Sequence, residues 1–227
     1  MAYHYLKHPE YFRITDKKHG ISYAGGDQKW YGRFFRRLAG CGPVAAANIF
    51  KYFSAEKLTG DSVSGYYTLK EYRKLMNDLW DHVTPSSQGV NNTKIFYSGC
   101  MSYAESKGFR IGYKYLDVSG ISEPRPSLKK IYEFISVSLD KDLPTAFLSL
   151  DSGEELRIDK WHWMTVIGLH DGTAGGSPPD DPDPKNTVAG INIDFLDEGR
   201  IKHADLSKWY STTSSGGGFV SVSPVSK

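Results

Sequence analysis

The chain has 227 residues, enough for one large domain or two smaller subdomains with a substantial hydrophobic core. Its 28 Lys and Arg residues nearly balance its 26 Asp and Glu residues, which argues against a nucleic-acid surface or an anionic-lipid partner. No stretch approaches the roughly 20 apolar residues of a membrane span, and the first residues lack a signal-peptide pattern. We therefore expect a cytoplasmic protein with no nucleic-acid and no membrane partner; nothing indicates its oligomeric state.

The first half of the chain has mainly helical patterns. Residues 1–26 show no regular period and are expected to be irregular. Thr68 and Glu71 have the spacing of a capping box, in which each side chain bonds the other residue's backbone N–H at a helix start. Apolar periodicity and capping signals predict four helices, over about residues 43–54, from Thr68 onward, over about 93–107 and over about 127–140.

The second half changes to the period of strands. Alternating or short apolar runs predict strands over residues 110–118, 145–150, 161–170, 188–196, 200–206 and 219–225. Helices that precede strands, instead of alternating with them, indicate an α+β fold. We expect a single domain, with a helical subdomain over about 27–140, an antiparallel sheet over about 141–227, and a site in the cleft between them.

The segment Gly40–Phe50 places a cysteine, Cys41, at the start of a helix rich in small residues. The unpaired N–H groups and positive dipole end of a helix N-terminus favour the thiolate form of such a residue. The other cysteine, Cys100, lies on an apolar helical stripe and is expected to be an inert core residue. Two cysteines make no disulfide framework and have no zinc spacing, so we expect no metal and no cofactor.

A thiol nucleophile needs a nearby base and a group that orients the base. If the strands at 161–170 and 188–196 pair around the segment 171–187, residues whose numbers sum to about 356–358 lie opposite one another. An even register then brings His162 and Asp194 to the same face of the sheet. His170 is an alternative base, and Asn192 an alternative orienting group, because they share the same parity.

These motifs resemble those of the papain-like cysteine peptidases, and most closely the bacteriocin-processing peptidases that act at double-glycine leaders. Gly-Cys-Gly-Pro before a small-residue helix is similar to their nucleophile motif. The run HWMTVIGL is similar to their base-bearing strand, and INIDFLDEGRI to the following strand, which ends in Asp before a short turn. The resemblance implies a papain-like fold in which Cys41 is the nucleophile, His162 the general base and acid, and Asp194 the orienting carboxylate.

One position departs from the papain pattern. The oxyanion glutamine of papain lies six residues before the cysteine, where this chain has Phe35. Gln28, thirteen residues before Cys41, is the nearest candidate, provided that the segment 29–40 folds back. Loss of one oxyanion donor typically costs ~10²–10³ in turnover.

The expected function is that of a thiol-dependent, cysteine peptidase-like hydrolase. It would cleave an amide bond in a peptide or small amide through a Cys-His-Asp triad and a thioester intermediate. One alternative is a non-catalytic binding protein on a degenerate papain-like scaffold, which the phenylalanine at position 35 keeps open. Another is a cysteine acyltransferase or transglutaminase-like enzyme, which the residues alone do not distinguish from a hydrolase.

Overall fold

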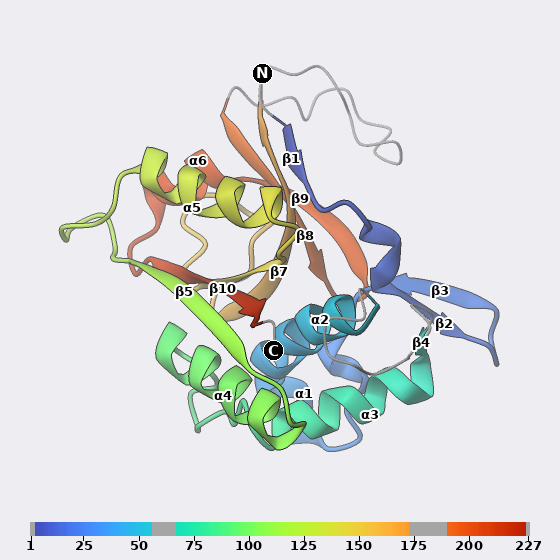
Figure 1. Cartoon of the computed structure of the whole chain (residues 1–227). Coiled ribbons are helices and arrows are strands. Elements are labelled where there is room, and N and C mark those ends of the chain that lie inside the picture. The colour runs from blue at the N-terminus through green and yellow to red at the C-terminus, as the bar shows by residue number, and fades with distance from the viewer. Residues whose placement is uncertain (1–2, 56–66, 173–189, 226–227) are drawn as a thin grey trace.

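The computed structural model describes residues 3–55, 67–172 and 190–225, which form a mixed α+β fold built around an antiparallel sheet (Figure 1). Its strands follow the order β5-β10-β6-β7-β8-β9, and β1 pairs with β7 beyond the end of β6. The strand bounds are β1 (Tyr3–Tyr5), β5 (Ile111–Val118), β6 (Thr145–Ser149), β7 (His162–Asp171), β8 (Ile191–Asp197), β9 (Arg200–Asp205) and β10 (Gly217–Pro224). A smaller sheet has the order β3-β2-β4, from β2 (Arg13–Asp16), β3 (Ile21–Ala24) and β4 (Tyr67–Thr68).

The four predicted helices are present. They are α2 (Cys41–Ala55), α3 (Leu69–Trp80), α4 (Thr93–Ser106) and α5 (Leu128–Asp140). The predicted capping box starts α3: the Thr68 side chain accepts from the Glu71 N–H, and the Glu71 carboxylate accepts from the Thr68 N–H at 2.7 Å. The first of the four begins at Cys41, two residues earlier than expected, so Cys41 lies in the first turn of α2.

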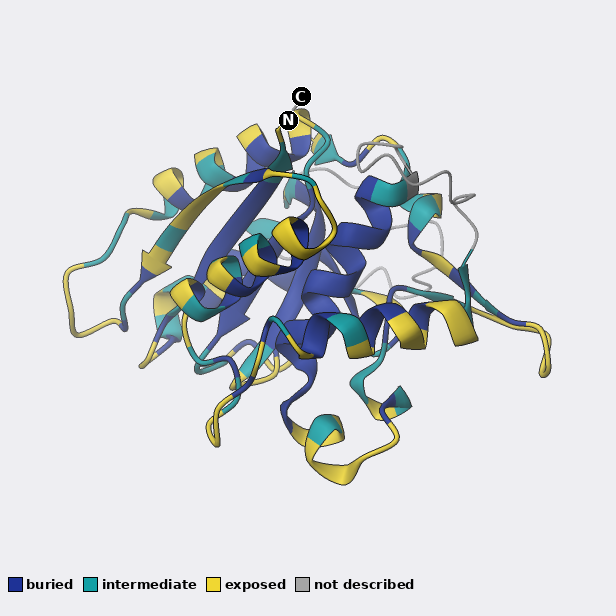
Figure 2. Cartoon of the chain, turned by 60° about the horizontal axis from the view of Figure 1, so that its bottom comes forward, coloured by how far each residue is buried: buried dark blue, intermediate teal, exposed yellow. Residues whose placement is uncertain are grey.

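Helix α2 is the central helix of the molecule. It packs against β7 and β6 on one side and against α3 and α4 on the other. Ala45, Ala46 and Ala47 are almost wholly buried, and Figure 2 shows α2 dark blue along its length while the outer helices keep an exposed face. Small side chains let the helix approach the sheet closely. Helices α5 and α6 (Leu206–Thr212) lie on the opposite side of the sheet (Figure 1).

Residues 3–26 contain regular elements, contrary to the expectation that residues 1–26 are irregular. They contain β1, β2, β3 and a 3₁₀ turn, η1 (Pro9–Phe12). These pieces are three or four residues long, too short for a periodic signal, and tertiary partners supply their pairing: β1 extends the large sheet along β7. Helices α1 (Phe34–Ala39) and α6 were also not predicted, because they too are short. The large sheet is not built by residues 141–227 alone as expected, since it also contains β1 and β5.

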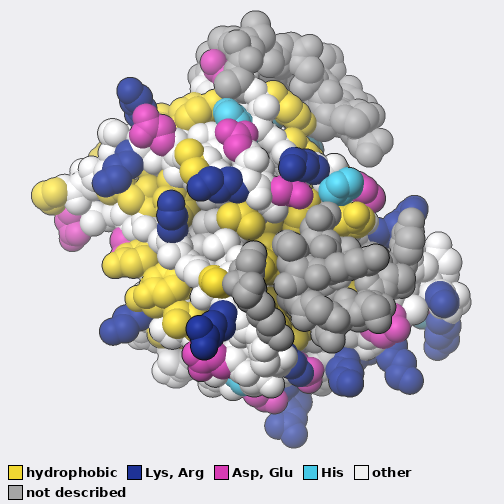
Figure 3. Space-filling view, viewed as in Figure 1, with side chains coloured by type: hydrophobic (Ala, Val, Ile, Leu, Met, Phe, Trp, Pro, Cys, Tyr) yellow, Lys and Arg dark blue, Asp and Glu magenta, His cyan; other side chains and the backbone are white. Residues whose placement is uncertain are grey.

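The face in Figure 3 mixes cationic and anionic side chains over most of its area. Hydrophobic side chains gather on its left, where β5 and α4 lie. There Tyr113 and Tyr115 are exposed on the edge strand β5, and the Tyr113 ring stacks on that of Tyr97 with centroids 4.1 Å apart. Among the described helices, none has both the length and the hydropathy to cross a membrane. The predicted strand start at Val188 lies outside the described residues.

Candidate active site

Close packing on both sides fixes the position of Cys41. A Cβ atom added to Gly42 would lie 2.8 Å from Val90 Cγ2, and one added to Gly40 would lie 2.5 Å from the ring of Tyr31. Real side chains do not tolerate such distances, so both neighbours of the cysteine must be glycine. The Gly-Cys-Gly sequence therefore places the sulfur at the N-terminus of α2, with 7% of the residue exposed.

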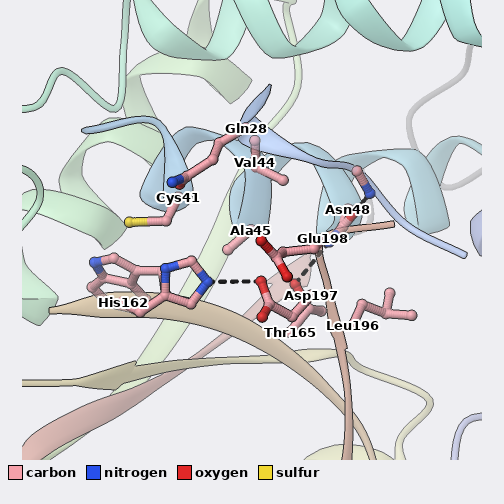
Figure 4. Close-up of a pocket in the computed structure, with 12 residues that line it drawn as sticks. Gln28, Cys41, Val44, Ala45, Asn48, His162, Thr165, Leu196, Asp197 and Glu198 are labelled. Carbon is pink, nitrogen blue, oxygen red and sulfur yellow. Dashed lines mark hydrogen bonds and ion pairs between the residues drawn. The ribbon is translucent and has the colours of Figure 1, made fainter. Parts of the chain in front are cut away.

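His162 is the first residue of β7 and lies between Cys41 and a carboxylate. Its Nε2 is 2.7 Å from Oδ1 of Asp197, the last residue of β8. The ring presents its other nitrogen toward the Cys41 sulfur (Figure 4), and the two groups interact closely enough to shift each other's pKa. Only 12% of the His162 side chain and 6% of the Asp197 side chain are exposed. Water therefore weakens neither contact appreciably.

The electrostatics favour a charged thiolate–imidazolium pair. Burial by itself raises the pKa of the Cys41 thiol, but hydrogen bonds from His162 and from backbone N–H groups bring that pKa below its ordinary value. Burial lowers the pKa of His162, but the contacts with Asp197 and Cys41 outweigh it and raise this pKa to about 10. For Cys100 burial acts alone and raises the thiol pKa, so only Cys41 has the environment of a reactive cysteine.

The structure does not bring Asp194 to His162. Asp194 lies 2.5 Å from Nδ1 of His203 and 3.4 Å from Nε2 of His170, and Asp197 takes the place expected for it. The reason is the register of β7 and β8. Thr165 lies opposite Leu196, so the numbers sum to 361 instead of 356–358.

A register shift between Val166 and Gly168 then brings Asp194 opposite Gly168, well away from the strand start. One signal in the sequence favours Asp197 over Asp194: it directly precedes a turn. Glu198 and Gly199, both with positive φ, turn the chain from β8 into β9. The expected Asp at a strand end before a short turn therefore corresponds better to residue 197.

Gln28 does lie beside Cys41. It begins the 3₁₀ turn η2 (Gln28–Trp30), and Asp27 caps this turn by accepting from the Lys29 N–H at 2.7 Å. Gln28 lines one small cavity together with Cys41 and His162, and its amide nitrogen points toward Cys41 in Figure 4. Its Oε1 is buried and has no hydrogen-bond partner among the described residues. Helix α1 takes up most of the extra length between Gln28 and Cys41.

Asn48, which sequence analysis missed, holds the Gln28 segment against α2. Its Oδ1 accepts from the Gly26 N–H at 3.0 Å and from the Tyr72 hydroxyl at 2.5 Å, and its Nδ2 donates to Thr165 Oγ1 at 3.1 Å. Asn48 lies about two helical turns after Cys41 on the same side of α2. One buried amide thus ties the Gln28 segment, α3 and β7 to the helix that carries the cysteine.

A groove of about 400 Å³ leads to Cys41. Its walls are mainly apolar, with a polar rim; the wall residues are Phe35, Leu38, Val90, Leu148 and Trp161, and the rim residues include Ser87, Gln88 and Asn91. Trp161 is 57% exposed and has a φ of 55°, a left-handed conformation that is costly for a bulky residue. Strain of this kind, next to His162 and on the groove wall, is typical of functional sites.

Three possible metal ligands, Asp159, His162 and Asp197, lie within 4.8 Å of one another. The Asp197 carboxylate is already engaged on both oxygens, by His162 at Oδ1 and by Lys202 Nζ at 2.6 Å from Oδ2. A cation here would have to displace Lys202 or His162. The arrangement is therefore that of a carboxylate that orients an imidazole.

No protein-family model and no curated protein matches this chain.

Proposed function

We propose that this protein is a thiol-dependent hydrolase with a papain-like fold, and that it uses Cys41, His162 and Asp197 to cleave an amide bond. The observation that carries the proposal is the arrangement of Cys41, His162 and buried Asp197 around one cavity, with His162 hydrogen-bonded to Asp197 and facing the sulfur, beside a groove that opens onto Cys41. The chain order Cys, His, Asp and the central helix packed on an antiparallel sheet support the resemblance to papain-like peptidases, and to the bacteriocin-processing branch among them.

In the first half-reaction, the Cys41 thiolate attacks the amide carbonyl carbon, and a C–S bond forms. The Cys41 backbone N–H and the Gln28 side-chain amide donate hydrogen bonds to the resulting oxyanion. The imidazolium of His162 gives its proton to the leaving nitrogen as the C–N bond breaks. The products are a free amine and a thioester on Cys41.

In the second half-reaction, water attacks the thioester while His162 takes the proton of that water. The C–S bond breaks, the carboxylic acid leaves, and the thiolate–imidazolium pair is restored. An amine in place of water would give acyl transfer. The apolar groove walls favour a peptide or small amide with an apolar group near the attacked carbonyl.

Trapping of the acyl-enzyme tests the proposal. The protein is mixed with N-acetyl-phenylalanine p-nitrophenyl ester, quenched in acid and analysed by peptide mass spectrometry. We expect the acyl group on Cys41, none in Cys41→Ala, and normal labelling in Cys100→Ala, which removes the buried thiol. A protein without a Cys41 adduct would be a binding protein. If added glycine methyl ester intercepts the acyl group faster than water, the enzyme is a transferase.

Replacement of Gln28 by alanine should lower kcat by ~10²–10³ and leave the ionisation of Cys41 unchanged, because the amide acts on the oxyanion and not on the thiol. Steady-state hydrolysis of the same ester and thiolate absorbance at 240 nm measure the two effects. Lys29→Met is the control on the same 3₁₀ turn, since the Lys29 side chain points to Glu198. A kcat of wild-type size in Gln28→Ala would remove Gln28 from the oxyanion site.

A further inference from the structure

A lysine holds the far side of the carboxylate that orients His162. Asp197 Oδ2 lies 2.6 Å from Nζ of Lys202, while Oδ1 faces His162. Lys202 also contacts Glu198 Oε2 at 3.1 Å, and Glu198 Oε1 lies 2.5 Å from Nζ of Lys29, the residue after Gln28. Charges therefore alternate from the imidazolium to the 3₁₀ turn that carries the oxyanion glutamine.

The β8–β9 hairpin fixes this contact. Asp197 pairs with Arg200, and Lys202 lies two residues further along β9, so it reaches Asp197 as a diagonal neighbour on the same face. The turn of the hairpin is bonded to the segment before η2: the Gly199 N–H donates to Gly26 O at 3.0 Å, and the Ala24 N–H donates to Gly199 O at 2.9 Å. The backbone pairing of β8 with β9, and the bonds of Gly199 to the segment before η2, thus fix the strand position from which Lys202 reaches Asp197.

We propose that Lys202 is a positioning residue for the catalytic site: it keeps Asp197 anionic and directed at His162, and so sets the lower pH limit of the thiolate–imidazolium pair. This inference rests on the proposed function, because it assumes that the pair is the reactive form of Cys41. No contact with substrate is required of Lys202.

The physical argument is one of desolvation. Burial raises the pKa of Asp197, and the contacts with His162 and Lys202 reverse this and bring it to about 2. Without Lys202, Oδ2 loses its cationic partner while the carboxylate stays buried, so protonation occurs at a higher pH. Protonated Asp197 no longer stabilises the imidazolium, whose proton then returns to the thiolate.

The other ionisable groups around Asp197 do not replace Lys202. They are Cys41 on α2, His162 on β7, Asp159 before β7, Glu198 in the turn, and Asp27 and Lys29 at η2. Among them His162 belongs to the pair itself, and Lys29 is engaged with Glu198. The acidic groups oppose ionisation of Asp197.

The test is the acid midpoint of the Cys41 thiolate, followed by absorbance at 240 nm against pH in the full-length protein. Lys202→Met should move this midpoint, and the acid limb of kcat/KM, upward by roughly 1 pH unit, since Lys202 is partly exposed and screened. Lys202→Arg should keep the wild-type midpoint. Lys208→Met, which removes an exposed lysine on α6, should leave both curves unchanged.

A double-mutant comparison separates positioning from general destabilisation. In an Asp197→Asn background, Lys202→Met should cause no further shift of the acid midpoint, because the carboxylate on which it acts is gone. Lys202→Gln is made in parallel: its amide can still donate to Asp197, which spares the fold, and it should also raise the midpoint. Thermal melting at pH 7 identifies folded variants.

The outcomes separate the two proposals. If wild type shows no thiolate below the ordinary range of thiols, the proposed function fails. If wild type shows it and folded Lys202→Met or Lys202→Gln keeps the same acid midpoint, only the role of Lys202 is overturned. An equal shift in the Asp197→Asn background would also overturn it.

Discussion

His162→Ala is expected to lower kcat/KM by ~10²–10⁴, because both the general acid and the counterion of the thiolate are lost. The Cys41 thiol should then ionise no lower than an ordinary cysteine, near pH 8.5, since burial acts on it without the imidazole. Thiolate absorbance at 240 nm and steady-state hydrolysis of the ester measure the two effects.

In wild type, the charged pair exists above the lowered pKa of Cys41 and below the pKa of His162, which is about 10. As pH rises through about 10, His162 loses its proton, and both the leaving-group acid and the attraction within the pair are lost. The basic limb of kcat/KM, which reports the free enzyme, should therefore fall near pH 10 in wild type and be absent in His162→Ala.

His170→Ala is the matched control, because His170 lies on the same strand but contacts Asp194 instead of Asp197. It should leave the ionisation of Cys41 and kcat/KM close to wild type. If the two alanine variants behaved alike, or if His162→Ala kept a thiol of low pKa, His162 would not be the base.

Asp197→Asn and Asp194→Asn should differ sharply in activity although they change two buried carboxylates of one strand. Asp197→Asn removes the charge that stabilises the imidazolium, so kcat/KM should fall by ~10²–10⁴ and the thiol pKa should rise. Asp194→Asn affects the contacts with His170 and His203, not the one between His162 and Asp197, and should keep the wild-type thiol. Ester hydrolysis and thiolate absorbance of the two variants measure this difference.

Acid stability should not separate the two variants in the same way. The pKa of Asp197 is lowered to about 2 from 3.8, so this carboxylate contributes about 2 kcal/mol of stability above pH 4, which is lost as pH falls to about 2. The pKa of Asp194 is lowered too, despite its burial, by His170 and His203. Both variants should therefore flatten the acid dependence of the free energy of unfolding. For the activity prediction, an Asp197→Asn variant with wild-type kcat/KM and a wild-type thiol pKa would show that Asp197 is not part of the triad.

The sequence by itself was sufficient to predict those elements whose signal lies in neighbouring residues. The capping box at Thr68 and the 3.6-residue period of the long helices depend only on neighbouring residues, and these helices were predicted within a few residues. The sequence also singled out Cys41 and His162, which the structure places at one cavity, because the glycines beside the cysteine and the start of the apolar strand are features of a few consecutive residues.

Only the tertiary structure decided which groups meet them. The partner of His162 depends on strand register, and a difference of a few residues replaced Asp194 by Asp197. Gln28 reaches the cavity because α1 and the bonds of Asn48 return the chain to α2, and Lys202 reaches Asp197 across a hairpin. The strand register and the position of the Gln28 segment against α2 are set by the packing of distant segments against one another, and no single stretch of the chain encodes that packing.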